Sequence, residues 1–185
     1  MHESVLAELV RDGIVESQHF GHLIALDTSG APALIKGNPN ELIYPRSAIK
    51  SIQASAMVRK GLVQEVRSLA LICASHSGSG AHQEVALEIL RSAGLDESAL
   101  QCALDRPLGA QERKEWGDKA PTRLAMNCSG KHAGMLATCV ANNWPIENYL
   151  EPTHPLQIAI REELETLAGE KVSHITVDGC GAPLF

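Results

Sequence analysis

The chain has 185 residues with a formal net charge of −6, and 44% of its residues are hydrophobic while 21% are charged. This composition predicts a globular chain with one substantial core and excludes a disordered protein. Nucleic-acid binders concentrate Lys and Arg on one face, but this acidic chain has no basic run, so we expect no nucleic-acid partner. No segment reaches the roughly 18 uninterrupted apolar residues that a bilayer span needs, so we expect no membrane association.

The cysteines favour a reducing compartment. The chain has five of them, and its start, "MHESVLAELVRDG", lacks the basic and then apolar pattern of a secretory signal. An odd number of cysteines without an export signal favours free thiols in the cytoplasm over a disulfide framework. We therefore expect these side chains to fill the core or to bind a metal ion.

Strand patterns are expected first and helical patterns afterwards. Residues 13–37 read as strands interrupted by the turn signal "TSG", which predicts a hairpin. Two apolar stretches are expected to be strands that run into glycine-containing loops, at residues 68–78 and 173–183. Apolar residues at helical spacing predict five helices, and the helix expected at residues 96–104 also begins with an acidic cap. These expected helices cover residues 46–61, 81–94, 96–104, 131–143 and 155–169.

The stretch "YPRSAIKS" carries a possible nucleophile and base. Ser47 and Lys50 are three residues apart, so on a helix the hydroxyl and the amine share one face. A serine acts as a nucleophile when a neutral lysine takes its proton. Pro45 marks a helix start, where the macrodipole favours charge on the attacking oxygen. The alternative is a chance pair, because Ser-x-x-Lys occurs in many helices.

The stretch "CASHSGSGAH" is a candidate active-site loop. Ser75 and His76 follow an expected strand and precede an expected helix, where α/β proteins often carry functional side chains. The alternative is a polar turn with a helix cap, in which His76 and His82 are ordinary surface groups.

Two further stretches, "NCSGKHAGML" and "TVDGCGAP", hold possible metal ligands. Cys128 and Lys131 lie at the mouth of an expected helix, and Cys180 follows Asp178 in a glycine-rich turn. Zinc prefers thiolate and nitrogen donors in a tetrahedron, and Asp178 would orient a water at the fourth position. The alternative is that both cysteines are small buried apolar residues and that Lys131 is solvated.

Taken in order, these stretches resemble the L-asparaginase II family, the Rhizobium-type asparaginases. The matching pieces begin near residue 13 and continue to the last turn: "GIVESQH", "GNP", "PRSAIK", "CASHSG", "NCSGKHAGML", "THP" and "DGCGAP". The resemblance implies an α/β (α+β) fold with a mixed, largely antiparallel sheet flanked by helices, related to serine β-lactamases and serine-dependent glutaminases. It also implies hydrolysis of L-asparagine to L-aspartate and ammonia.

The resemblance assigns roles to the serines and the lysine. Ser47 would be the nucleophile, Lys50 its base, and Ser75 a second active-site serine whose partner lysine lies further along in the family. Backbone N–H groups near "CASHSG" or at the helix start of Ser47 would stabilise the oxyanion. Arg46 is the candidate for the substrate carboxylate, and His76 is a further candidate for substrate binding.

The resemblance also implies a zinc ion, Zn²⁺, held by Cys128, Lys131 and Cys180, with Asp178 holding its water. Family members are longer, so we expect residues 1–185 to be the N-terminal part of the family's single domain. From the apolar finish at 184–185 we expect a homodimer. Two alternatives stay open: a serine–lysine hydrolase of another amide such as glutamine, and a non-catalytic fragment of such an enzyme.

Overall fold

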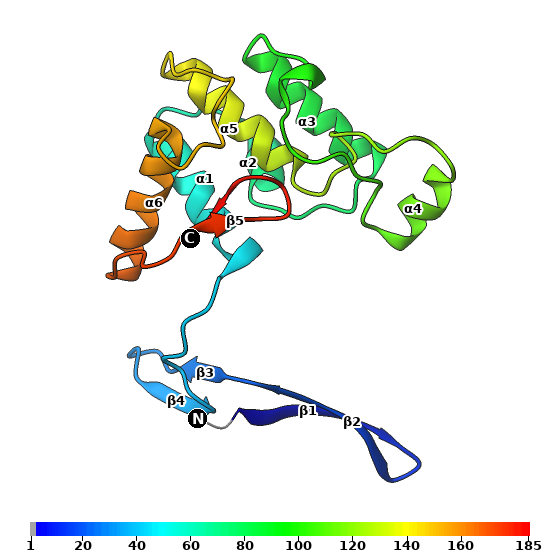
Figure 1. The fold of residues 1–185 in the computed structure, drawn as a ribbon, viewed down its shortest axis with the longest axis vertical. Helices are drawn as coiled ribbons and strands as arrows, with labels where there is room; N and C mark the ends of the chain where they lie inside the picture. Colours follow the sequence, from blue (N-terminus) through cyan, green and yellow to red (C-terminus); the bar gives the residue numbers. More distant parts are fainter. Residues whose placement is uncertain (1–2) are drawn as a thin grey trace. The chain divides into compact units, whose positions relative to one another are not determined.

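A computed structural model describes residues 3–185 (Figure 1). The chain divides into two compact units, of which the first ends at Ile43 and the second begins at Tyr44. None of the helices formed by residues 3–185 combines the length and the apolar character that crossing a membrane requires.

The first unit consists of two antiparallel hairpins. Strand β1 pairs with β2, and β3 pairs with β4. The four strands are β1 (Ser4–Arg11), β2 (Ile14–Gly21), β3 (Leu23–Leu26) and β4 (Pro32–Lys36). The β1–β2 turn has positive φ at Asp12 and Gly13, which matches the twist of a tight hairpin. The hairpin predicted around "TSG" is confirmed as β3–β4, whereas sequence reasoning did not identify β1.

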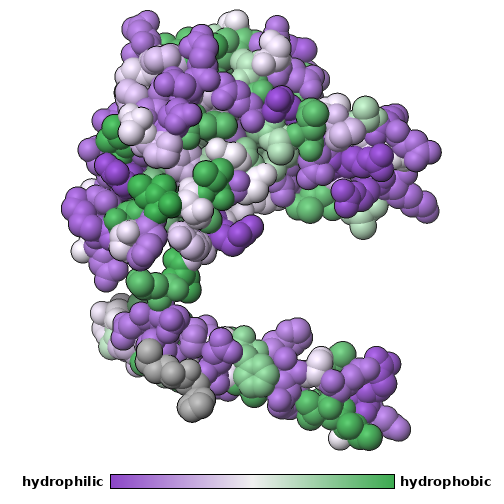
Figure 2. Space-filling model, viewed as in Figure 1, coloured by the Kyte–Doolittle hydropathy of each residue, from purple (hydrophilic) through white to green (hydrophobic). Residues whose placement is uncertain are grey.

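The strands of this unit leave their apolar side chains uncovered. No side chain of residues 3–43 is buried, and Phe20, Leu26 and Ile14 are among the exposed ones. Figure 2 shows hydrophobic side chains of this unit in green, in separate groups among purple hydrophilic ones. A two-stranded hairpin is marginally stable by itself in water. The unit therefore offers apolar surface and open strand edges to another protein surface.

The second unit is built around one buried helix, α5. Every residue of α5 from Ser129 to Cys139 is buried, and the helix packs against α1, α2, α3 and α6 (Figure 1). A helix buried on all sides belongs in the core. The helices are α1 (Lys50–Arg59), α2 (Val66–Ile72), α3 (Gly80–Ser92), α4 (Ala110–Trp116), α5 (Ser129–Ala141) and α6 (Pro155–Ala168). Short 3₁₀ turns cover Arg46–Ile49 and Glu97–Ala99.

Two local predictions are wrong. The stretch 68–78 was expected to begin as a strand, but α2 covers Val66–Ile72, because a short apolar run has no period that distinguishes a buried strand from a buried helix. The helix expected at 96–104 is limited to a 3₁₀ turn, although Asp96 caps it by accepting the Ser98 N–H. Helix α4 was not predicted. The helices expected near 46–61, 81–94, 131–143 and 155–169 are confirmed.

The last strand pair frames a tight turn. Strand β5 (Thr176–Val177) pairs with β6 (Pro183–Leu184), and Asp178 accepts the N–H groups of Cys180 and Ala182 through Oδ1. The expected α/β class with antiparallel strands is confirmed. Within residues 3–185, strands β1 to β6 form three separate two-stranded sheets.

The glycine of the "SGKH" stretch allows α5 to approach α2 closely. A Cβ at Gly130 would stand 2.7 Å from Leu71 Cγ and 2.9 Å from the Leu71 carbonyl oxygen. A backbone atom cannot move away as a side-chain tip can. In contrast, a Cβ at Gly80, the first residue of α3, meets nothing within 4 Å.

We therefore expect Gly130→Ala to have a free energy of unfolding about 1–3 kcal/mol below that of Gly80→Ala, because overpacking opposes the shared gain in helix propensity. Urea denaturation of the two variants measures the difference. Equal stabilities would show that α5 moves away from α2 without penalty.

Candidate active site

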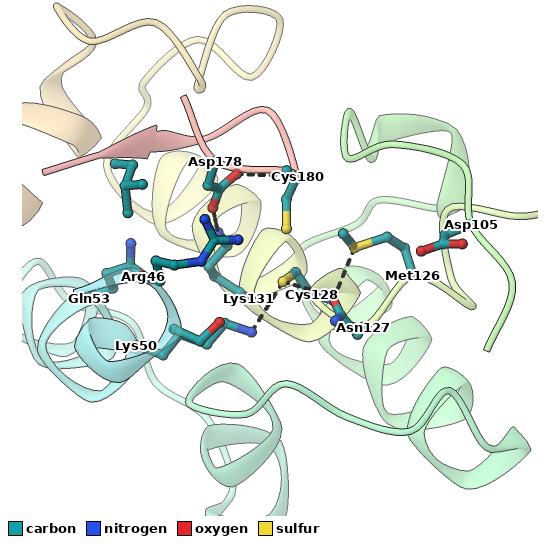
Figure 3. A pocket seen from close by; sticks show the side chains of 13 residues that line it. Arg46, Lys50, Gln53, Asp105, Met126, Asn127, Cys128, Lys131, Asp178 and Cys180 are labelled. Atoms are coloured by element: carbon teal, nitrogen blue, oxygen red, sulfur yellow. Dashed lines mark hydrogen bonds and ion pairs between the residues drawn. The ribbon is translucent and has the colours of Figure 1, made fainter. Parts of the chain in front are cut away.

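A cavity of about 270 Å³ lies in the second unit, where the start of α1, the start of α5 and the β5–β6 turn meet (Figure 3). This volume is slightly below the roughly 300–1,000 Å³ of pockets for drug-sized ligands, so it suits a small polar molecule. Seven predicted site residues line it: Arg46, Ser47, Lys50, Cys128, Lys131, Asp178 and Cys180. Three distant stretches of sequence therefore converge on one cavity.

Ser47 lies in the 3₁₀ turn before α1, and Lys50 is the first residue of α1. Arg46 has a positive φ of 50°, and the 3₁₀ turn Arg46–Ile49 follows directly. Side chains at i and i+3 eclipse in a 3₁₀ turn. Lys50 is 3% exposed, and its Nζ donates to the Ala74 carbonyl at 2.5 Å and to Ser75 Oγ at 2.8 Å. A buried amine is thus held in contact with the loop that follows α2.

The two serines and the lysine form a continuous chain of contacts. Ser75 Oγ lies 3.2 Å from Ser47 Oγ and accepts from Lys50 Nζ. The sequence placed Lys50 in direct contact with Ser47, but within residues 3–185 the hydroxyl that Lys50 reaches is that of Ser75. Ser75 therefore stands between the proposed nucleophile and the proposed base, and it has a lysine partner in this chain.

The two predicted thiol ligands lie against each other. A hydrogen bond from Cys180 lowers the pKa of the Cys128 thiol to about 6, and the charges of Lys131 and Lys50 add to this against the opposing effect of burial. The same hydrogen bond, together with burial, raises the pKa of Cys180. Lys50 Nζ is 3.2 Å from Cys128 Sγ. The Cys128 sulfur is thus the member of the pair that most readily carries a negative charge.

Lys131 is the third predicted metal ligand. Its side chain is 2% exposed and its Nζ lies 2.8 Å from Asp178 Oδ2. Figure 3 shows Lys131 and Asp178 pointing toward each other and the Cys128 and Cys180 sulfurs facing the same space. Asp178 is held in place by the turn N–H groups that it accepts.

This donor set fits a zinc ion. Two adjacent thiols and one amine are the soft and nitrogen donors that zinc prefers, and a carboxylate within reach can orient a water. Across residues 3–185 no cluster of three or more His, Cys, Asp or Glu side chains is arranged to hold a metal, and the third donor that the sequence predicts beside the two thiols is the amine of Lys131. Lys131 would release its proton on binding, as protein metal ligands do.

Ser75 and His76 are the two predicted site residues that do not line the cavity, and His76 has a structural role. It is 3% exposed, with Nε2 2.9 Å from Ser129 Oγ, and Nδ1 accepts the Gly78 N–H. Burial, with the charges of His82 and Lys50, lowers the pKa of His76 to about 4. A neutral His76 therefore ties the Ser75 loop to the start of α5.

Sequence reasoning missed several residues that line the cavity, above all Gln53 and Asp105. Gln53 is 4% exposed, and its Oε1 is buried without a hydrogen-bond partner in residues 3–185. Such an unpaired oxygen costs about 1–3 kcal/mol. The available signal was its position, three residues after Lys50. Figure 3 shows Gln53 and Asp105 on opposite sides of the cavity.

Comparison with known proteins identifies the family. The family model described as L-asparaginase II matches residues 7–185, which is nearly the whole chain. No curated protein matches the chain significantly. A match of this extent, over a chain in which Ser47, the two lysines and the two thiols share one cavity, shows that the protein belongs to the L-asparaginase II family of asparaginase-type hydrolases.

Proposed function

We propose that this protein hydrolyses the side-chain amide of L-asparagine to L-aspartate and ammonia through a seryl ester on Ser47. Family membership supports the reaction class. The observation that carries the mechanism is the chain of contacts from Ser47 Oγ through Ser75 Oγ to Lys50 Nζ, whose two ends, Ser47 and Lys50, line the cavity. A hydroxyl needs a base to become a nucleophile, and this chain connects it to one.

Proton transfer follows the same contacts. With Lys50 neutral, Ser75 passes its proton to Nζ while it takes the proton of Ser47, and the Ser47 oxygen attacks the amide carbon. Lys50 then returns the proton toward the leaving nitrogen, so that ammonia departs and the ester remains. Water attacks the ester in the second half-reaction, with the same groups accepting its proton. Backbone N–H groups of the loop at 75–78 or of the 3₁₀ turn would stabilise the oxyanion.

The remaining groups of the cavity bind and orient the substrate. Arg46 presents a guanidinium fork, which matches a carboxylate. Cys128, Lys131 and Cys180 would hold the zinc ion, with Asp178 beside it. When bound, the zinc supplies positive charge that polarises an oxygen near the ester. Asp178 also keeps Lys131 inside the cavity through their 2.8 Å contact.

Ammonia release from L-asparagine, compared with L-glutamine, tests this function. We expect asparagine to be preferred by roughly 10- to 200-fold in kcat/KM, because an extra methylene displaces the amide from Ser47. Equal or faster ammonia release from glutamine would favour the alternative amidohydrolase. No release from either substrate by folded protein would favour a non-catalytic fragment.

We also propose that the protein works in the cytoplasm as a homodimer. The five cysteines are all free thiols, which suits a reducing compartment. The uncovered apolar strands of the first unit support association, because large exposed apolar patches mark interaction surfaces.

A further inference from the structure

We propose that Gln53 is a specificity-determining residue, whose side-chain carbonyl oxygen accepts a hydrogen bond from the α-ammonium group of the amino-acid substrate. This inference rests on the proposed function, since it concerns how the same cavity binds the α-ammonium group of the substrate. It makes the cavity selective for amides that carry an α-amino group over otherwise identical amides without one.

The first observation is that Gln53 is buried and yet not held. No hydrogen bond of its side chain to another of residues 3–185 occurs, although it is only 4% exposed. Three buried side-chain polar atoms of the described residues have no partner, on Gln53, His132 and Gln157, and only Gln53 lines the cavity. Since the terminal torsion of a glutamine is broad, its amide can turn either end toward a ligand.

Gln157 shows what a structural buried glutamine looks like in this fold. It is 1% exposed and its Oε1 also lacks a partner, but its Nε2 donates to the Tyr149 carbonyl at 2.7 Å. That contact anchors the start of α6. Gln53 has no such anchor, so packing alone does not explain an amide at this position of α1.

The second observation is the state of the other acceptors around the cavity. Asp178 already accepts from Lys131, Cys180 and Ala182. Asp105 accepts the Arg106 N–H and lies on the far side from Gln53 in Figure 3. An ammonium group needs acceptors, and the buried acceptor of the cavity with no donor is Gln53 Oε1.

The third observation is position. Gln53 follows Ser47 by six residues, three along the 3₁₀ turn at about 2.0 Å per residue and three along α1 at about 1.5 Å, which corresponds to about 10 Å along the axis. That span accommodates a hydroxyl in contact with the amide carbon at one end of an asparagine and an acceptor on its α-nitrogen at the other. Arg46 and Gln53 lie on the same side of the cavity in Figure 3, as a carboxylate and an ammonium on one carbon require.

Steady-state kinetics with matched substrates test the proposal. Succinamate is L-asparagine without its α-amino group, and β-alaninamide is L-asparagine without its α-carboxylate. In Gln53→Leu we expect KM for L-asparagine to rise roughly 10- to 100-fold with kcat within about threefold of wild type, because a hydrogen bond to a charged group is lost. The rise should persist for β-alaninamide and fall below about threefold for succinamate. An equal rise for succinamate, or none for L-asparagine, overturns the proposal.

Two further variants separate recognition from structure. Gln53→Glu keeps acceptor oxygens of the same shape, so its KM for L-asparagine should stay well below that of Gln53→Leu; a larger rise would mean that the amide N–H₂ group donates instead. Gln157→Leu removes a buried glutamine outside the cavity, and it should lower stability without a selective change in KM. If Gln53→Leu does not fold, Gln53→Met, which keeps an unbranched side chain, takes its place.

A binding measurement tests the role of Gln53 separately from the proposed hydrolysis. Calorimetric titration of Ser47→Ala protein with L-asparagine and with succinamate needs no turnover. We expect L-asparagine to bind roughly tenfold or more tightly than succinamate, and the ratio to approach one in Ser47→Ala/Gln53→Leu. If wild-type protein releases no ammonia but this ratio depends on Gln53, the proposed function fails and recognition by Gln53 stands. If ammonia is released but the ratio is the same with and without Gln53→Leu, the proposed function stands and recognition by Gln53 fails.

Discussion

Ser47→Ala is expected to lower kcat for ammonia release from L-asparagine by about 10³-fold or more, because the variant lacks the oxygen that attacks the amide carbon. Ser47 is exposed at the start of α1, so its hydroxyl contributes little to the core and the protein should keep its fold. Circular dichroism and thermal unfolding verify the fold, and a coupled ammonia assay measures the rate.

Ser75→Ala should reduce kcat by roughly 10²- to 10⁴-fold, because Ser75 carries the contact between Ser47 and Lys50. The matched control is Ser77→Ala in the same loop, where the hydroxyl donates to Glu112 outside the cavity and activity should stay near wild type. Combining Ser47→Ala with Ser75→Ala should add little to the loss, since groups that act as a unit are strongly non-additive. Activity within about tenfold of wild type in Ser47→Ala would rule out this serine as the nucleophile.

Purified wild-type protein is expected to contain one zinc ion per chain, and Cys128→Ala is expected to contain none. Structural zinc sites depend on each thiolate ligand, and Cys128 is the thiol whose pKa is lowered, to about 6. Elemental analysis after dialysis gives the stoichiometry without reference to turnover.

Cys139→Ala provides the control for the zinc experiment. It removes a thiol from a buried position inside α5, the helix that Cys128 precedes, but burial raises the pKa of Cys139 to about 12 and Cys139 does not line the cavity. Its zinc content should equal that of wild type. Retention of zinc in Cys128→Ala, or equal loss in both variants, would show that the ion is held elsewhere or reports only on the general stability of α5.

The sequence predicted which residues line the cavity better than it predicted the secondary structure of residues 68–78. The spacing of Ser47 and Lys50, and the two glycine-flanked cysteines, are local patterns that the residue types themselves display, and the cavity contains all four. The run at 68–78 has no such internal signal. The secondary structure of this stretch depends on the packing of α2 against Gly130 of α5, a contact between residues far apart in the chain.

The sequence by itself determined the family, the main helices and seven of the residues that line the cavity, because these depend on residue type and on short spacings. Only the tertiary structure decided which of them meet. It placed Ser75 between Ser47 and Lys50, turned His76 into a brace, and left the amide of Gln53 unpaired beside the cavity. Such choices follow from the packing of segments distant in sequence, and packing is a property of the folded chain as a whole.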